Sequence, residues 1–114
     1  MDDCLFCKIV AGDIPADVVY RDEQVTAFRD IQPQAPTHVL LVPNRHVDSL
    51  NDLEEDHHDT IGHLMRMVRV VARGQAIAES GYRVVVNMGP DAMMTVPHLH
   101  LHILGGRKLG WPPG

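Results

Sequence analysis

The chain is predicted to fold as a single α+β domain, residues 1–114, with a mostly antiparallel sheet packed against one long helix. Short β-rich runs come first, one amphipathic helix follows, and further β-rich runs end the chain. No internal repeat and no long linker divides the sequence. A length of 114 residues is typical of one domain and leaves little margin of stability, so pairing with a second copy would help.

The first half of the chain contains three predicted strands. Residues 17–20 and 24–28 are rich in β-branched and aromatic residues and are separated by a short polar turn, as in a hairpin. Residues 31–36 form a loop that contains two prolines. Residues 38–42 form a buried strand, which Pro43 ends.

The one long helix is predicted to begin near Asn51 or Asp52, because Asp52 and Glu55 fit a capping box. Apolar residues then recur at helical spacing and form one stripe. The stripe comprises Ile61, Leu64, Met65, Val68, Ala72 and Ala76. Gly81 is expected to end the helix.

Two more strands are predicted after the helix. Residues 82–87 are a β-branched run, residues 88–91 are rich in turn formers, and a histidine-rich strand covers about residues 96–104. The pair Gly105-Gly106 ends that strand. The tail, residues 109–114, has neither a helical nor a strand pattern.

The composition excludes several classes of protein. Ten basic and 15 acidic residues give a net charge of −5, and no Lys and Arg cluster stands out. We therefore expect neither a nucleic-acid polymer nor a membrane surface as partner. The longest apolar runs, such as residues 39–42, are too short to span a bilayer. The N-terminus lacks the basic and apolar regions of a signal peptide, so we expect a cytoplasmic protein.

Eight histidines are many for so short a chain, and three of them fall in one predicted strand. Because alternate residues of a strand face the same side, His98, His100 and His102 are expected in one row. A lone strand histidine is usually solvated or structural, but three consecutive ones gain nothing for stability. The row therefore predicts a functional site in which imidazoles surround a small anion.

The segment from His98 to Leu104 resembles the motif of the histidine triad (HIT) superfamily, in which three histidines alternate with apolar residues. Residues 6–16 look like the family's N-terminal segment, and residues 27–38 resemble its ribose-binding loop. Residues 104–107 and 111–114 look like the Hint branch of nucleotide-binding proteins. The resemblance implies a HIT-like fold with a short N-terminal helix, forming a two-fold dimer in which the C-terminal tail reaches towards the partner's active site.

The resemblance also implies a reaction. Hint-type proteins are purine nucleotide-binding hydrolases that cleave nucleoside 5′-phosphoramidates, such as an AMP-amine, through a nucleotidyl-histidine intermediate. His100 matches the nucleophile of the family, and His102 matches the histidine that contacts phosphate oxygens. His38 matches a supporting position beside the triad. A backbone carbonyl of the motif's own strand is expected to fix the ring nitrogen of His100 that faces away from phosphorus.

Other family positions form the expected nucleotide site. Asp30 matches the ribose-binding acid, because a carboxylate can accept hydrogen bonds from both vicinal hydroxyls. Asn87 resembles a residue that contacts phosphate. The apolar residues that match the purine pocket are Phe6, Ile9, Ile14, Phe28 and Ile31. Without the resemblance, those apolar residues would be interpreted as core and Asp30 as an exposed loop acid.

One segment departs from the family pattern. Hint-type members carry Gly-Gly-Gln and then Ser or Thr before the triad, whereas this chain has Ala92-Met93-Met94-Thr95. Thr95 keeps the hydroxyl that can donate to a leaving group, but Met94 has no amide donor. The departure predicts weaker phosphoramidase activity or an altered leaving-group preference, with nucleotide binding retained.

Cys4 and Cys7 are the only cysteines of the chain. In a reducing cytosol their spacing indicates metal ligands or a redox pair, and two small apolar residues are a third interpretation. The resemblance implies a structural zinc, held by Cys4, Cys7, His46 and the first triad histidine, His98. The helix histidines are interpreted as solvated: His57, His58 and His63.

Two alternative functions stay open. One is a dinucleoside polyphosphate hydrolase of the same family, which the tail Trp111-Pro112-Pro113-Gly114 disfavours. The other is a nucleotide-binding regulatory protein with little turnover, which the replacement Ala92-Met93-Met94 favours. A pure metal-binding module would leave Asp30 and Asn87 unexplained. The leaving group, and the choice between adenine and guanine, are left open by these residues.

Overall fold

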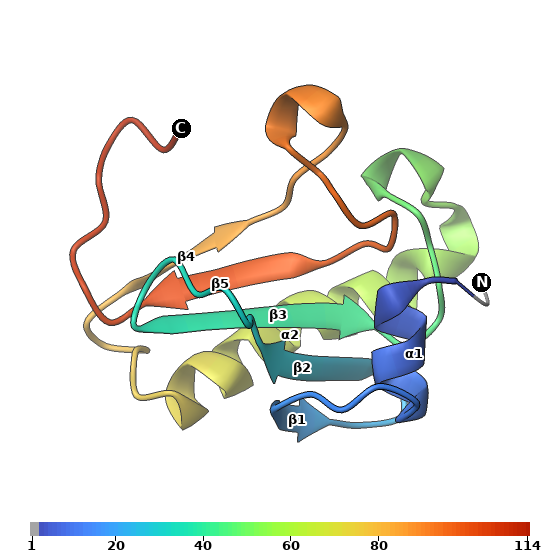
Figure 1. Cartoon of the computed structure of the whole chain (residues 1–114), viewed down its shortest axis with the longest axis horizontal. Helices are drawn as coiled ribbons and strands as arrows, with labels where there is room; N and C mark the ends of the chain where they lie inside the picture. The colour runs from blue at the N-terminus through green and yellow to red at the C-terminus, as the bar shows by residue number, and fades with distance from the viewer. Residues whose placement is uncertain (1–2) are drawn as a thin grey trace.

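The computed structural model describes residues 3–114, in which five strands form one antiparallel sheet in the order β1-β2-β3-β5-β4. The α+β prediction is thereby confirmed; residues 1 and 2 of the predicted domain lie outside the described part. Figure 1 shows helix α1 on one face of the sheet and helix α2 behind the other. The elements are α1 (Leu5–Ala11), β1 (Val18–Arg21), β2 (Val25–Arg29), β3 (Thr37–Pro43), η1 (Leu50–Asp52), η2 (Glu55–His57), α2 (His58–Gly74), β4 (Tyr82–Val85), η3 (Pro90–Ala92) and β5 (Leu101–Gly105).

Strand β3 is the centre of the sheet, and all seven of its residues are buried. Val39 and Leu41 belong to the larger core cluster, which α2 covers. Leu40 and Val42 belong to a smaller cluster, which α1 covers. A strand that is covered on both faces needs apolar residues at every position, which explains its unbroken apolar run.

The long helix begins later and ends earlier than predicted. Two short 3₁₀ turns, η1 and η2, precede α2, and the capping box is made by Glu54 and His57 instead of Asp52 and Glu55. The helix ends at Gly74, not at Gly81. Leu64, Val68 and Ala72 are buried as predicted, together with Met67 and Val71, but Met65 is 52% exposed and Ala76 lies beyond the helix. The buried face of α2 is thus rotated about the helix axis, by part of a turn, from the predicted stripe.

The strand limits agree with prediction in the first half of the chain and differ in the second. Strand β5 begins at Leu101, so only the last triad histidine lies in it, and the first two lie in the segment before it. The prediction of one strand over residues 96–104 was wrong, because His98 bonds its backbone N–H to Val96, two residues back, instead of to a neighbouring strand. The alternating apolar residues Leu99, Leu101 and Ile103 nevertheless face α2, as expected.

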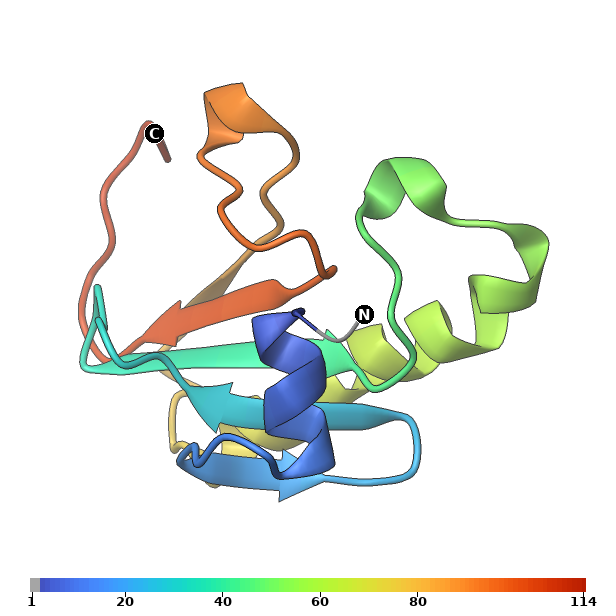
Figure 2. The same ribbon diagram turned by 45° about the vertical axis from the view of Figure 1, so that its right-hand side comes forward.

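Strand β4 forms one edge of the sheet, and the C-terminal tail lies on the same side of the molecule. Within residues 3–114, β4 pairs only with β5. Arg83 of β4 stacks on the Trp111 ring, which is 81% exposed. Figure 2 shows the tail running upward from the end of β5, past the segment that follows β4. An edge strand beside an exposed aromatic ring is a surface suited to a partner.

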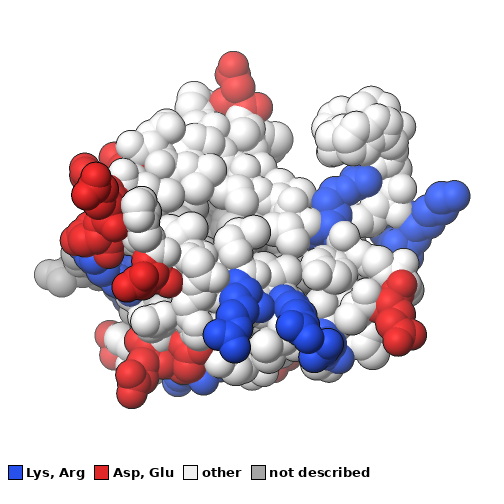
Figure 3. All heavy atoms as spheres, turned by 180° about the vertical axis from the view of Figure 1, so that it is seen from behind, with Lys and Arg blue, Asp and Glu red and all other residues white. Residues whose placement is uncertain are grey.

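The charged side chains are distributed unevenly over the surface. Figure 3, the view from behind, shows basic groups over α2 and acidic groups gathered at the end of the molecule where η1 and η2 lie. The exposed arginines of α2, Arg66, Arg69 and Arg73, form a narrow stripe and not a broad field. Among the described helices, none is long and apolar enough to cross a membrane.

Candidate active site and metal centre

The three triad histidines come together on the face that α1 covers. Leu40 of β3 is paired with His102 of β5, so both side chains point to the α1 face, and His38 shares that face two positions along β3. The Phe6 ring of α1 packs edge-on against His98 and His100, with ring centroids 5.9 and 5.0 Å apart. The predicted row of histidines is therefore present, although only His102 lies in the strand.

His100 is buried, and its orientation is set by the backbone. Its Nδ1 lies 2.7 Å from the carbonyl oxygen of His98. A carbonyl only accepts, so Nδ1 carries the hydrogen and Nε2 keeps a free lone pair. The ring is thus held in the tautomer that a nucleophile requires.

The neighbouring pair, His38 and His102, has the opposite arrangement. The backbone N–H of Gln34 donates to Nδ1 of His38 at 3.0 Å, so His38 is neutral and carries its hydrogen on Nε2. That Nε2 lies 2.9 Å from Nδ1 of His102 and donates to it. His102 consequently carries its hydrogen on Nε2. The pair therefore gives the site a hydrogen-bond donor, whereas His100 gives it a lone pair.

Burial keeps both rings of this pair neutral. It lowers the pKa of His38, although the nearby Asp30 carboxylate opposes the shift. Burial, followed by the charges of His100 and His38, lowers the pKa of His102 to about 4. Asp30 lies with one carboxylate oxygen 3.5 Å from Nε2 of His38 and accepts from the Gln32 N–H with the other. At neutral pH the His38 and His102 rings are therefore neutral.

Asp30, His38 and His102 are close enough together to hold a cation. The hydrogen-bond pattern opposes that role. A metal ligand needs the lone pair of His38 Nε2, but the Gln34 N–H already occupies the lone pair on Nδ1 and leaves the hydrogen on Nε2. This cluster is better described as a hydrogen-bonded relay than as a metal site.

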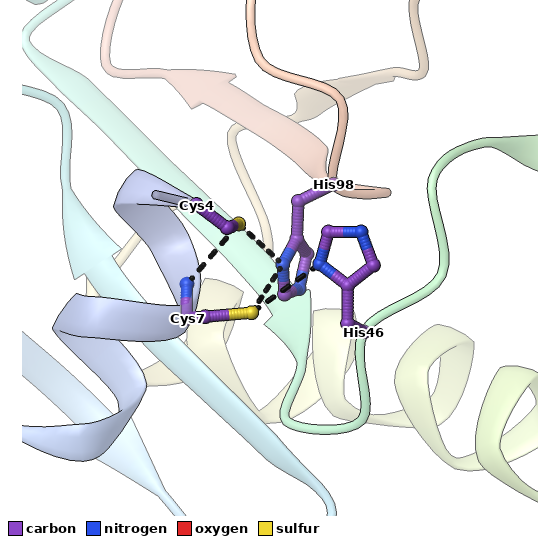
Figure 4. A group of neighbouring side chains, drawn as sticks. All are labelled: Cys4, Cys7, His46 and His98. Atoms are coloured by element: carbon purple, nitrogen blue, oxygen red, sulfur yellow. Dashed lines mark hydrogen bonds between the residues drawn. The ribbon is translucent and has the colours of Figure 1, made fainter. Parts of the chain in front are cut away.

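Cys4, Cys7, His46 and His98 form a second cluster, in which one atom of each side chain lies within 4.8 Å of the others. Figure 4 shows the cysteines at the start of α1, His46 after β3 and His98 before β5, all pointing toward one another. Nδ1 of His98 is 3.3 Å from the sulfur of Cys4 and 3.5 Å from that of Cys7, and Nδ1 of His46 is 3.2 Å from the Cys7 sulfur. Tetrahedral bonds to zinc place sulfur and nitrogen about 3.5 Å apart, so the donors fit that ion.

The outer nitrogens of the two histidines strengthen this fit. Nε2 of His98 donates to the Pro43 carbonyl at 2.9 Å, and Nε2 of His46 donates to the Asp48 carboxylate at 2.5 Å. Both Nδ1 atoms are thereby left with lone pairs that face the sulfurs, which is the usual arrangement of metal-binding histidines. Four side chains from three segments are thus arranged as a metal site.

The thiol of Cys7 stays protonated when no cation is present. Burial, the hydrogen bond with Cys4 and the charge of Cys4 raise the pKa of Cys7 to about 11. A cation that replaces the thiol protons would relieve this cost, because sulfur binds metal as the thiolate.

The apolar residues expected around a purine divide into two groups. Phe6, Ile9 and Phe28 are buried and Ile14 is half-buried, all in the core cluster under α1. Ile31 is 95% exposed. The first group therefore forms a fixed wall beside the triad, and Ile31 projects freely from the loop that carries Asp30.

Asn87 and Thr95 flank the loop that departs from the family pattern. Asn87 follows β4 and is half-buried, whereas Thr95 is exposed and lines a hollow with Cys4 and His46. Within residues 3–114, neither side chain forms a hydrogen bond to the triad. Met93, between them, has φ of +62° and is 79% exposed. Glycine adopts a positive φ without strain, as the family's glycines would at this position. Methionine at the same position carries a conformational cost.

The structure adds three groups that sequence reasoning missed: the Gln34 N–H, the Pro43 carbonyl and the Asp48 carboxylate. Two of them are backbone groups, which every residue possesses, so no residue type could have indicated them. Asp48 was detectable in principle, since an acid two residues after a proposed metal-binding histidine is a common supporting partner.

Three alternating histidines at and just before the central strand β5 of an antiparallel sheet define a histidine triad protein. Residues 11–109 match the HIT domain family, and the chain belongs to that family. It is 43% identical to the purine nucleoside phosphoramidase of Escherichia coli K12, over 96% of this chain and 92% of that one. It is 50% identical to the 14 kDa zinc-binding protein of Zea mays, over 96% of this chain and 87% of that one. The crystal structure of a HIT family hydrolase from Legionella pneumophila superposes with a TM-score of 0.95, at 45% identity, over 98% of this chain and all of that one.

Proposed function

We propose that this chain is a purine nucleotide-binding hydrolase that cleaves nucleoside 5′-phosphoramidates through a nucleotidyl-His100 intermediate. The observation that carries the proposal is the pair of opposite tautomers: His100 offers a lone pair on Nε2 and His102 offers a hydrogen on Nε2. A nucleophile beside a donor is what displacement at phosphorus needs. The 43% identity to the E. coli phosphoramidase supports the same reaction.

The proposed chemistry has two steps. Nε2 of His100 attacks the α-phosphorus, the P–N bond breaks, and the amine leaves with a proton that the Thr95 hydroxyl relays from solvent. Water then attacks the same phosphorus, the bond to Nε2 breaks to restore the neutral His100 ring, the water releases one proton to solvent, and nucleoside monophosphate leaves. His102 stabilises the transferring group by donating to a phosphate oxygen, and Asp30 accepts from the ribose hydroxyls. Asn87 contacts phosphate, and His38 holds His102.

Mass spectrometry under single turnover tests this proposal. We expect protein mixed with AMP- or GMP-phosphoramidate to gain one nucleotidyl group at His100. His100→Ala should lose turnover by at least about a thousandfold, as removal of a nucleophile does. His58→Ala removes an exposed histidine at the start of α2 and serves as the matched control. A His100→Ala variant with full turnover would contradict the nucleophile.

The two alternative functions are outcomes of the same assay. Faster cleavage of a dinucleoside polyphosphate than of either phosphoramidate would favour the first. Tight nucleotide binding with negligible turnover would favour a regulatory protein. In that case Met94→Gln, which restores an amide donor before Thr95, should raise kcat/KM.

We further propose that Cys4, Cys7, His46 and His98 hold a structural zinc ion. The close approach of the four donor atoms supports it, as does the 50% identity to the maize zinc-binding protein. A cytoplasmic location suits the site, because reducing conditions keep both thiols free. Protein purified without chelator should contain one zinc per chain by elemental analysis, and Cys7→Ser should lose it; a metal-free wild type would contradict the site.

A homodimer is also part of this proposal. Strand β4 has a free edge among the described residues, and Trp111 lies exposed beside it on Arg83. Pairing of two such edges would cover both features and add the buried surface that a chain of this size lacks.

A further inference from the structure

Arg107 lies just after β5, outside the triad, yet it contacts the loop that sets the triad's hydrogen bonds. Its Nη2 donates to the carbonyl oxygen of Gln34 at 2.9 Å, and its Nη1 donates to the carbonyl of Lys108 at 3.1 Å. Gln34 is the residue whose N–H donates to His38. Arg107 therefore holds the carbonyl group of Gln34. The N–H group of the same residue determines the tautomer of His38.

The chain is shaped to bring Arg107 back to this loop. Gly106 has φ of +90°, and a Cβ at this position would lie 2.9 Å from the Cβ of Pro36. Only glycine allows both the left-handed turn and this close approach. The end of β5 and the loop before β3 thus meet backbone to backbone.

Apart from Arg107, the contacts that hold Gln34 among the described residues come from its own loop and from His38. Pro33 and Pro36 have fixed φ angles, and the Gln34 side chain bonds only to the carbonyl of Gln32, within the same loop. Gln34 and Arg107 are both exposed. The bond between them is therefore a surface contact whose loss leaves the core intact, and it holds the carbonyl of the residue whose N–H reaches His38.

The direction of the relay depends on that N–H. If it no longer reaches His38, the hydrogen of His38 is free to move to Nδ1, and Nε2 then accepts instead of donating. His102 would in turn carry its hydrogen on Nδ1 and would present a bare Nε2. The site would then have two lone pairs and no imidazole donor.

We propose that Arg107 is a positioning residue: by holding the Gln34 carbonyl, it imposes the Nε2–H tautomer on His38 and, through it, on His102. The effect on turnover rests on the function proposed above. The effect on tautomers does not, so the two can be tested separately.

The experiment uses the full-length chain with 15N-labelled histidine. Long-range 1H–15N spectra distinguish a protonated ring nitrogen from a bare one at each histidine. The variants are Arg107→Met, which keeps an unbranched apolar side chain but has no donors, and Arg107→Lys, which restores one cationic donor group. Lys108→Met is the matched control, because it removes the neighbouring exposed charge and leaves the Lys108 carbonyl in place.

We expect the wild type and Lys108→Met to show His38 and His102 protonated on Nε2. Arg107→Met should show mixed or reversed tautomers at both rings, and Arg107→Lys an intermediate state. With an AMP-phosphoramidate, kcat of Arg107→Met should fall by about tenfold at nearly unchanged KM, which is the scale of one hydrogen bond from a charged donor. Melting temperatures check that each variant is folded.

Wild-type tautomers in folded Arg107→Met would overturn the proposal, and so would an equal loss of kcat in Lys108→Met. A wild type that turns over no phosphoramidate would contradict the proposed function. The spectra would still test the role of Arg107.

Discussion

At the scale of single residues, four histidines of one chemical type have different roles because different groups bond to them. The His98 carbonyl leaves Nε2 of His100 bare, and the Pro43 carbonyl leaves Nδ1 of His98 bare. The Gln34 N–H acts in the opposite sense and leaves the hydrogens of His38 and His102 on Nε2. Backbone groups are suited to this task because, unlike side chains, they do not titrate.

Acid should destabilise the protein through His102. Its pKa of about 4 in the folded state lies below its ordinary value of 6.5, so the unfolded chain binds a proton that the folded chain excludes. Stability should be complete above pH 6.5 and should fall as pH drops toward 4, by on the order of 2 kcal/mol. Urea unfolding at a series of pH values measures this slope.

His102→Gln is the control for that series. Its stability should depend less on pH over the same window, since glutamine does not titrate. A wild-type stability that stays constant from pH 7 to pH 4 would rule out a buried neutral His102.

At the scale of elements, one carboxylate connects the first hairpin with the long helix. Asp22 lies in the turn between β1 and β2 and accepts from Tyr20 at 2.7 Å, from His63 of α2 at 2.7 Å, and from two backbone N–H groups. Burial opposes its ionisation, but these hydrogen bonds outweigh burial and hold its pKa well below the usual range. His63, predicted to be solvated, therefore has a structural partner.

Asp22→Asn should lower the free energy of unfolding at pH 7 by about 1–2 kcal/mol, because the charge on these hydrogen bonds is lost. The pKa of Asp22 is lowered, so its contribution is complete above about pH 4 and is lost as pH falls further. The deficit of the variant, measured by urea unfolding, should therefore shrink toward pH 2. Glu23→Gln, an exposed neighbour with the same change of charge, should have little effect; an equal loss would argue against the hydrogen-bond explanation.

Helix α1 should depend on metal for its stability. Its first turn carries two of the four ligands, and with only seven residues it has little helical stability of its own. Chelation should increase hydrogen exchange in α1 and at His98 more than in α2, and zinc should reverse the change. Uniform exchange across the chain after chelation would argue against this local connection.

At the scale of the whole molecule, the larger core and the candidate site lie on opposite faces of the sheet. The face under α2 holds the larger core, and the face under α1 holds the triad and the metal cluster. His38 and His102 are held on the central strands β3 and β5, whose other face packs on the larger core.

The proposed homodimer is a feature of the whole molecule. Light scattering should give twice the 12.7 kDa mass of the chain. Val84→Pro in β4 should shift the mass toward that of the monomer if the edges pair, because proline removes a backbone donor from a strand. A wild type that is monomeric at micromolar concentration would contradict the dimer.

Much of this protein followed from the sequence alone. Runs of β-branched, aromatic and apolar residues placed the first three strands within a residue or two, and the motif around His100 identified the family, because both are local patterns of residue type. Met65 and Ala76 of the predicted stripe and the start of β5 were wrong, since burial of Met67 in place of Met65, and the turn at His98, depend on contacts with distant parts of the chain.

The sequence determined which residues could do chemistry: three alternating histidines, Asp30, and a pair of cysteines with His46. Only the tertiary structure decided which ring nitrogen of each histidine is free to accept and which can donate. It did so by bringing carbonyls and N–H groups from other segments, among them Pro43 and Gln34, to one nitrogen of each ring. A ring has one hydrogen to place when neutral, so the partner of one nitrogen determines whether the other nitrogen carries a hydrogen or a lone pair.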